Sequence, residues 1–195
     1  MIKERKEFRK EREKHFEHAD HSLTAAVYGE PVHFMENGEW KEIDNTVEVN
    51  AEGRYENRHN DMKVSFALDA SDGKLVEIQK DGHRLSWKME GIQKRPPQMK
   101  KPVDRKPNEE KQRPEDAMAL HTLACGVDYA NVQEDMDLSY VLKSKTLKEN
   151  VIFKQMPKDP KITFEITTAL IPVQSGGRVV FQTEDGTDIF IMPAP

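Results

Sequence analysis

Polar and apolar residues alternate along most of this chain, and short polar turns interrupt the alternation. The clearest case is residues 32–49, where an apolar run ends at Met35, the turn Glu36-Asn37-Gly38-Glu39 follows, and a second run extends from Trp40 to Val47. Asn-Gly between two alternating runs is a strong β-hairpin signal, because both residues tolerate the positive φ angles of a tight hairpin turn. The pattern therefore predicts a hairpin centred on Asn37-Gly38.

The same alternation recurs on both sides of this hairpin. Asp72-Gly73 and Asp81-Gly82 separate further short runs, and Leu85, Trp87 and Met89 share one side of the last run. Strand candidates in this first block are residues 23–28, 61–68, 75–79 and 84–89. Short alternating runs joined by turns are typical of antiparallel sheets with one face in the core and one in solvent.

A second block repeats the pattern, with turns at Gly176-Gly177 and at Gly186. Its strand candidates are residues 122–129, 138–143, 150–154, 161–168, 178–182 and 188–192. We therefore predict a mainly β fold of antiparallel sheets, sandwich-like, in two β-rich blocks (residues 23–92 and 117–195). The sequence leaves open whether the two blocks share one core.

Two segments depart from the alternation. Residues 1–22 are dense in charge, with Lys3–Glu7 and Arg9–Glu13 spaced four apart, and we predict a charged, solvated helix there. Residues 93–116 hold five prolines among basic and acidic side chains, which predicts a long exposed linker or loop. A basic pair in it, Lys100-Lys101, is read as solvated rather than as a contact for an acidic partner.

Composition narrows the function classes. Hydrophobic residues make up 36% and charged residues 33% of the 195 positions, and the net charge of −5 argues against a nucleic-acid binder, which is usually basic. No run of 18 apolar residues is present, so we expect no membrane span, and the first residues lack the apolar core of a signal peptide. Cys125 is the only cysteine, which rules out an intramolecular disulfide and favours a small buried side chain.

Aromatic residues are the first candidates for a binding site. Trp40, Trp87 and Tyr28, with Tyr55, could offer flat faces on which a sugar ring stacks. Trp40 and Trp87 also occupy alternating runs, and core packing is the favoured interpretation for both.

Acidic and histidine clusters are the candidates for a metal site. Asp135 and Asp137, beside Glu134, offer carboxylates at alternate positions but lack the glycine and further ligands of a calcium loop. Asp44-Asn45 is a second candidate for a calcium site, but a turn or strand end is the simpler interpretation of this pair. Three histidines spaced three apart would follow one side of a helix, where a solvated face is favoured over a metal site: His15, His18 and His21.

The common motifs of catalysis are missing. The chain has no Gly-x-Ser-x-Gly, no His-Glu-x-x-His and no Gly-x-x-x-x-Gly-Lys. We therefore predict a protein that is not an enzyme and holds no cofactor.

Several stretches occur in an order that is more specific than hairpin chemistry. They include Asn37-Gly-Glu-Trp-Lys-Glu-Ile-Asp-Asn-Thr46, His83-Arg-Leu-Ser-Trp87, Val127-Asp-Tyr-Ala-Asn-Val132 and Ile189-Phe-Ile-Met-Pro-Ala-Pro195. Over residues 23–195 the chain resembles the N-terminal region of large clostridial and other Gram-positive cell-surface proteins. Those proteins carry DNRLRE modules and often RHS repeats, and are similar in plan to wall-associated protein A.

The resemblance implies a non-enzymatic structural or interaction module that lies outside the cell. The implied partners are other domains of a larger surface protein, or the cell wall and its glycans. A carbohydrate-binding module that uses Trp40 or Trp87 is the alternative. The resemblance assigns no active-site residues.

Overall fold

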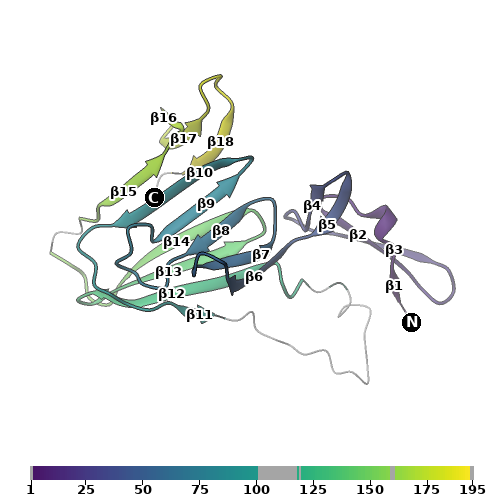
Figure 1. Ribbon diagram of the computed structural model, residues 1–195. Helices are drawn as coiled ribbons and strands as arrows, with labels where there is room; N and C mark the ends of the chain where they lie inside the picture. Colours follow the sequence, from purple (N-terminus) through teal and green to yellow (C-terminus); the bar gives the residue numbers. More distant parts are fainter. Residues whose placement is uncertain (1, 101–117, 119, 159–160, 194–195) are drawn as a thin grey trace.

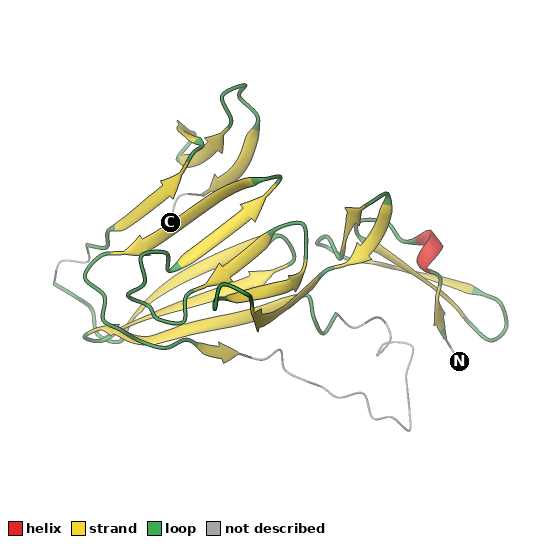
Figure 2. Cartoon of the chain, in the orientation of Figure 1, coloured by secondary structure: helices red, strands yellow, loops and turns green. Residues whose placement is uncertain are grey.

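The computed structural model describes residues 2–100, 118, 120–158 and 161–193, and its regular structure consists mainly of antiparallel β-sheets (Figures 1 and 2). The largest sheet has six strands in the order β15-β10-β9-β8-β7-β6. Its strands are β6 (Asp44–Val49), β7 (Tyr55–His59), β8 (Lys63–Phe66), β9 (Val76–Lys80), β10 (His83–Met89) and β15 (Phe164–Thr168). The prediction of a mainly β, antiparallel fold is confirmed.

A four-stranded sheet in the order β11-β12-β13-β14 lies against the six-stranded sheet (Figure 1). Its strands are β11 (Gln98–Lys100), β12 (Ala124–Gln133), β13 (Met136–Lys143) and β14 (Thr146–Phe153). The rings of Phe66 on β8 and Tyr140 on β13 meet with their centroids 5.6 Å apart, and the Tyr129 hydroxyl donates to the Ala67 carbonyl oxygen at 2.6 Å. Alternate side chains of the two sheets therefore face one another.

The core between these sheets is a single apolar cluster with members from both predicted blocks. Val64, Phe66 and Leu75 of the first block lie in it beside Leu138 and Tyr140 of the second, all fully buried. The two blocks, whose relation the sequence left open, thus share a core.

A small C-terminal sheet extends this core. It consists of β16 (Ile171–Ser175), β17 (Arg178–Gln182) and β18 (Asp188–Met192) in that order. Phe181 and Phe190 stand opposite each other in this sheet and belong to the main core cluster. Every residue of β16 is exposed.

The N-terminal segment is where the structure contradicts the sequence prediction. The helix predicted over residues 1–22 is absent from the described residues 2–22: β1 (Lys3–Glu4), one 3₁₀ turn η1 (Lys6–Phe8) and β2 (Glu13–Glu17) come first, and β2 pairs with β3 (Leu23–Val27). Strand alternation buries Lys14 and Phe16, and the Lys14 ammonium lies 2.5 Å from Glu42.

Other ion pairs replace the helical ones that the spacing predicts. The Arg9 guanidinium binds Glu4 at 2.7 Å and Glu42 at 3.4 Å, with 8% of its side chain exposed. Glu4, five residues away, and Glu42, 33 residues away, thus satisfy the Arg9 charge while an antiparallel hairpin forms.

The predicted hairpin at Asn37-Gly38 is confirmed. It joins β4 (His33–Glu36) to β5 (Glu39–Glu42), and Asn37 and Gly38 have φ angles of 52° and 81°. A second, smaller apolar cluster lies beside this hairpin and includes one residue from the later block: Val32, Phe34, Ile43 and Leu123.

The predicted linker, residues 93–116, lies mostly outside the described residues, because residues 101–117 are not described. The described part of this segment contains a strand: β11 pairs with β12, and Lys100 forms a 2.6 Å ion pair with Asp128. Within the described ranges, no helix is both long and apolar enough to cross a membrane.

Candidate functional site

The candidate site lies on β14, the last strand of the four-stranded sheet. Four alternate residues stand opposite members of the main core cluster on β13, so they point toward the six-stranded sheet: Leu147, Glu149, Val151 and Phe153. Three of the four are apolar, as a core-facing row requires. Glu149 places a carboxyl group in the middle of this apolar row.

Glu149 has one close polar partner on the neighbouring strand. The hydroxyl of Tyr140, directly opposite on β13, donates a hydrogen bond of 2.9 Å to Glu149 Oε1. Burial raises the pKa of Glu149 from 4.5 to about 7, and it also raises the pKa of Tyr140 well above 10. No ion pair among the described residues includes Glu149, so no cation from the described part of the chain lies beside its carboxyl group.

Trp87 completes the cluster from the other sheet. Its side chain comes from β10, and the residue is 7% exposed. The indole Nε1 lies near enough to Glu149 to act against the rise in the pKa of that carboxyl, but it makes no hydrogen bond of normal geometry with a described residue. A buried N–H donor and a carboxyl with no cation among its described neighbours therefore share one region of the core.

This arrangement can do two things chemically. A carboxyl whose pKa is about 7 exchanges a proton near neutral pH. It also offers a desolvated acceptor to any cation that reaches it, and ionisation of the carboxyl is favoured once the cation is in place. Neither property requires a metal ion or a cofactor.

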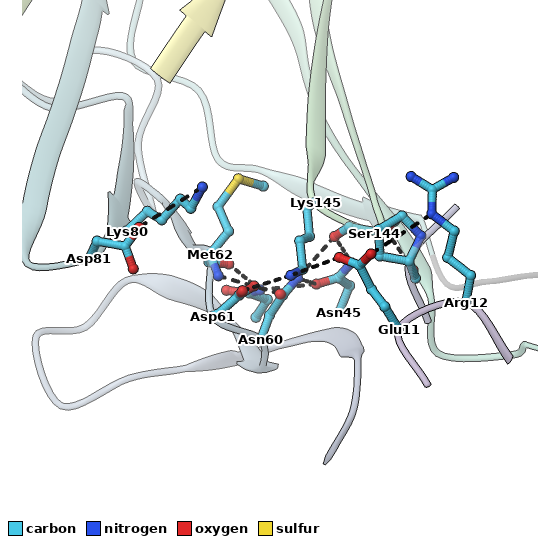
Figure 3. A network of polar contacts seen from close by, with 12 residues as sticks. Glu11, Arg12, Asn45, Asn60, Asp61, Met62, Lys80, Asp81, Ser144 and Lys145 are labelled. Carbon is cyan, nitrogen blue, oxygen red and sulfur yellow. Dashed lines mark hydrogen bonds and ion pairs between the residues drawn. The ribbon is translucent and has the colours of Figure 1, made fainter. Parts of the chain in front are cut away.

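A second polar cluster joins the two β-rich blocks at another place in the fold. The side-chain amide of Asn45 donates to the carbonyl oxygens of Leu123 at 2.8 Å and Ser144 at 2.9 Å, and its oxygen accepts from Asn57 and Asn60 at 3.0 Å each. Figure 3 shows this network, in which every polar atom of the Asn45 side chain has a partner. Such complete pairing is what a buried amide needs.

Charged residues extend the network toward the N-terminal hairpin. The Lys145 ammonium lies 2.7 Å from Asp61 and 3.9 Å from Glu11 (Figure 3). The Ser144 hydroxyl donates to the Pro31 carbonyl oxygen at 2.6 Å. The cluster thus connects three parts of the chain, and its role is to hold them together.

The aromatic residues of the predicted sugar-stacking platform lie in separate parts of the fold. Trp87 belongs to the main core cluster, whereas Tyr28 packs against the smaller one and donates from its hydroxyl to the Met118 carbonyl oxygen at 2.9 Å. Trp40 is partly buried on β5, and Tyr55 packs against the main core. The structure therefore does not bring Trp87 and Tyr28 onto one face.

The predicted acidic cluster lies at the hairpin between β12 and β13. Asp137 accepts from the backbone N–H of Asn131 at 2.6 Å and pairs with Lys154 at 2.9 Å, while Asp135 occupies the turn with a φ of 56°. A shallow polar hollow of about 420 Å³ lies here, lined by Gln93, Arg95, Asn131, Gln133, Glu134 and Asp135. Within the described part of the chain, no three His, Cys, Asp or Glu side chains are grouped to hold a metal ion.

The remaining candidates also have local partners. His15 lies 3.2 Å from Glu13, and His21 lies 3.0 Å from Glu17, while His18 contacts Thr24 at 2.7 Å. Because residues 13–17 form a strand, the three rings do not follow one helical face. Cys125 is buried, and burial raises the pKa of its thiol to about 12.

Sequence reasoning missed Glu149 as a site residue. The signal was present in the spacing of residues 147–153, where a carboxyl takes one place in a row of alternate apolar residues. No family model, curated protein or solved structure matches this chain. The family resemblance therefore remains an expectation from the sequence.

Proposed function

We propose that this protein is a non-enzymatic structural and interaction module, built as a β-sandwich, of a larger bacterial surface protein. The observation that carries the proposal is an aliphatic row on the outer face of the C-terminal sheet. Val173, Val180 and Ile191 stand side by side across β16, β17 and β18. The central Val180 is only 4% exposed, and its neighbours Val173 and Ile191 are 37% and 55% exposed.

A solvent-facing side of an antiparallel sheet is normally polar. Ile171 adds a further exposed aliphatic side chain, at 48%, to the same face of this sheet. An exposed group of large apolar residues is typical of a surface that another domain covers. The well-filled core and the fully paired Asn45 network suit a rigid support for such a surface.

The surface is tested with the double variant Val173→Lys/Ile191→Lys. We expect the wild-type protein to bind a fluorescent apolar dye and to self-associate at high concentration, and the variant to lose both properties while keeping its melting temperature. The exposed pair Glu184→Gln/Asp188→Asn serves as the control, since it changes the charge of the same sheet without touching the aliphatic row. Equal dye binding and association in wild type and Lys variant would count against an interaction surface.

The location is tested with antibodies against the purified chain. A surface protein is labelled on intact cells of the source organism, and labelling that appears only after lysis would contradict the proposal. Labelling of a known cytosolic protein controls for cell integrity.

The carbohydrate-binding alternative depends on exposed aromatic faces. Trp87, at 7% exposure, has little surface left for stacking on a sugar, so Trp40 alone would have to supply the face. A glycan array is expected to show no binding. A hit that Trp40→Ala abolishes would instead favour this alternative.

A further inference from the structure

The inner faces at two sheet edges are incompletely covered. β14 ends the four-stranded sheet and β15 ends the six-stranded sheet, so each strand has one edge that pairs with no other described strand. Phe153 on the inner row of β14 is 37% exposed, and Ile166, which stands opposite Trp87 across the pairing of β10 and β15, is 40% exposed. Apolar side chains that should face a partner therefore reach solvent at both edges.

The free edge of β14 is long and carries its own recognition elements. The strand spans eight residues, enough to pair with an extended segment along its whole length. Strand addition at a sheet edge obtains its affinity from backbone hydrogen bonds and its specificity from alternate side chains. The alternate side chains here are an apolar row interrupted by Glu149.

Charge complementarity identifies the side chain that belongs opposite Glu149. The carboxyl is largely buried; it accepts a hydrogen bond from the neutral hydroxyl of Tyr140, and the indole of Trp87 lies nearby. A buried carboxylate without a cation is costly, and a cation delivered by a partner removes much of that cost. Lys and Arg are the residues that supply such a cation on a long apolar stem.

We propose that the edge of β14 takes up an extended segment of another polypeptide, with alternating apolar residues and one Lys or Arg that pairs with Glu149. The inference rests on the proposed function as an interaction module and names the partner's chemistry. The segment adds a strand beside β14, lays its apolar row near Phe153 and Ile166, and brings its cation to the carboxyl group.

The test uses dye-labelled synthetic peptides and the full chain. The first peptide has the sequence VTVTKTVTV, the second has norleucine in place of its lysine, and the third has glutamate there. We expect the lysine peptide to bind, with slower hydrogen exchange of the β14 backbone amides. The norleucine and glutamate peptides should bind about tenfold to a hundredfold more weakly, as the loss of one charged hydrogen bond implies.

Protein variants provide the second arm. Glu149→Gln keeps the shape and should remove the preference for lysine over norleucine, whereas Glu184→Gln, a matched change on the exposed turn before β18, should keep it. If Glu149→Gln does not fold, the three peptides on the wild-type protein still decide the question.

Three results would overturn the inference. The first is no binding of the lysine peptide at about 1 mM, which is well above the Kd of ordinary specific peptide complexes. The second is equal binding of the three peptides. The third is slowed hydrogen exchange that does not include the β14 amides. Any of these together with labelling of intact cells would leave the proposed function standing. If the lysine peptide binds but the protein is labelled only after lysis, strand addition at β14 would stand and the proposed surface location would be contradicted.

Discussion

The side-chain amide of Asn45 donates a hydrogen bond of 2.9 Å to the carbonyl oxygen of Ser144, 99 residues further along the chain. The same amide reaches Leu123 at 2.8 Å, so one buried side chain binds two segments of the second block to β6 in the first. Asn45 is fully buried, and water cannot replace these contacts from the surface. The joint between the blocks therefore depends on this residue.

Replacing Asn45 by Ala is expected to destabilise the fold strongly. The change removes four buried hydrogen bonds, each worth about 0.5–1.5 kcal/mol, although each of the four partner groups keeps one other contact. We expect a loss of about 3 kcal/mol or more in the free energy of unfolding, measured by urea denaturation. Gln174→Ala on exposed β16 is the control and should stay within about 0.5 kcal/mol of wild type.

Glu149 should make the stability of the protein depend on pH. At pH values below 4.5 both the folded and the unfolded chain hold the proton, and burial of Glu149 costs little. Between pH 4.5 and about 7 the unfolded chain gives up the proton more readily than the folded chain, so Glu149 lowers the free energy of unfolding as the pH rises. Above about pH 7 this decrease is complete. The full contribution is of the order of 3 kcal/mol.

The measurement compares wild type and Glu149→Gln, because other carboxyl groups also titrate in this range. The stability difference between the two proteins is expected to move in favour of the variant from pH 4.5 to pH 7 and then to stay constant. A difference that does not change with pH would show that Glu149 titrates normally in the folded state.

Cys125 is expected to be almost inert in the folded protein. The thiolate is the reactive form, and burial raises the pKa of this thiol to about 12. A disulfide reagent at pH 8 should react only as fast as the protein opens, and it should react at once in concentrated guanidinium chloride. Rapid modification of the folded protein, with unchanged circular dichroism, would contradict the buried position.

The Phe16→Ala substitution is expected to loosen the N-terminal hairpin and to leave the sandwich unchanged. Phe16 is 2% exposed and belongs to neither of the two apolar clusters, so Phe16→Ala should remove about 3 kcal/mol or more of local packing. Hydrogen exchange should accelerate in β2 and β3 and stay unchanged in β12 and β13. Leu23→Ala, at an exposed position of β3, is the control.

The turns were predictable because their chemistry is local. Asn37-Gly38 and Asp81-Gly82 have the positive φ angles that their residue types indicate, and the alternating runs around them form strands. The inward positions of Phe66, Leu85 and Trp87 follow directly from a period of two.

The N-terminal strands were not predictable because their cause is distant in the sequence. Residues 13–17 contain one large apolar side chain, Phe16, and the strand also buries Lys14. That burial is possible because Glu42 lies 28 residues away on β5 and receives the ammonium group. Local charge spacing favoured a helix, and only the tertiary partner reverses that preference.

Only part of the candidate site could be predicted from the sequence. Trp87 was recognised as an inward aromatic residue, but its neighbours Tyr140 and Glu149 come from strands more than 50 positions later. Side chains that meet across two sheets leave no mark in the spacing of either strand. Only the apolar row around Glu149 gave a local hint.

The position of β15 has a consequence for synthesis on the ribosome. β10 pairs with β15, so the partner of residues 85–89 is residues 164–168. While the nascent chain is being made, that edge of the large sheet stays unpaired until residues 164–168 have emerged. Non-local pairing of this kind slows folding, and a bare edge invites association between neighbouring chains. A chaperone that shields extended segments would therefore raise the yield of this protein more than that of a helical protein of equal length.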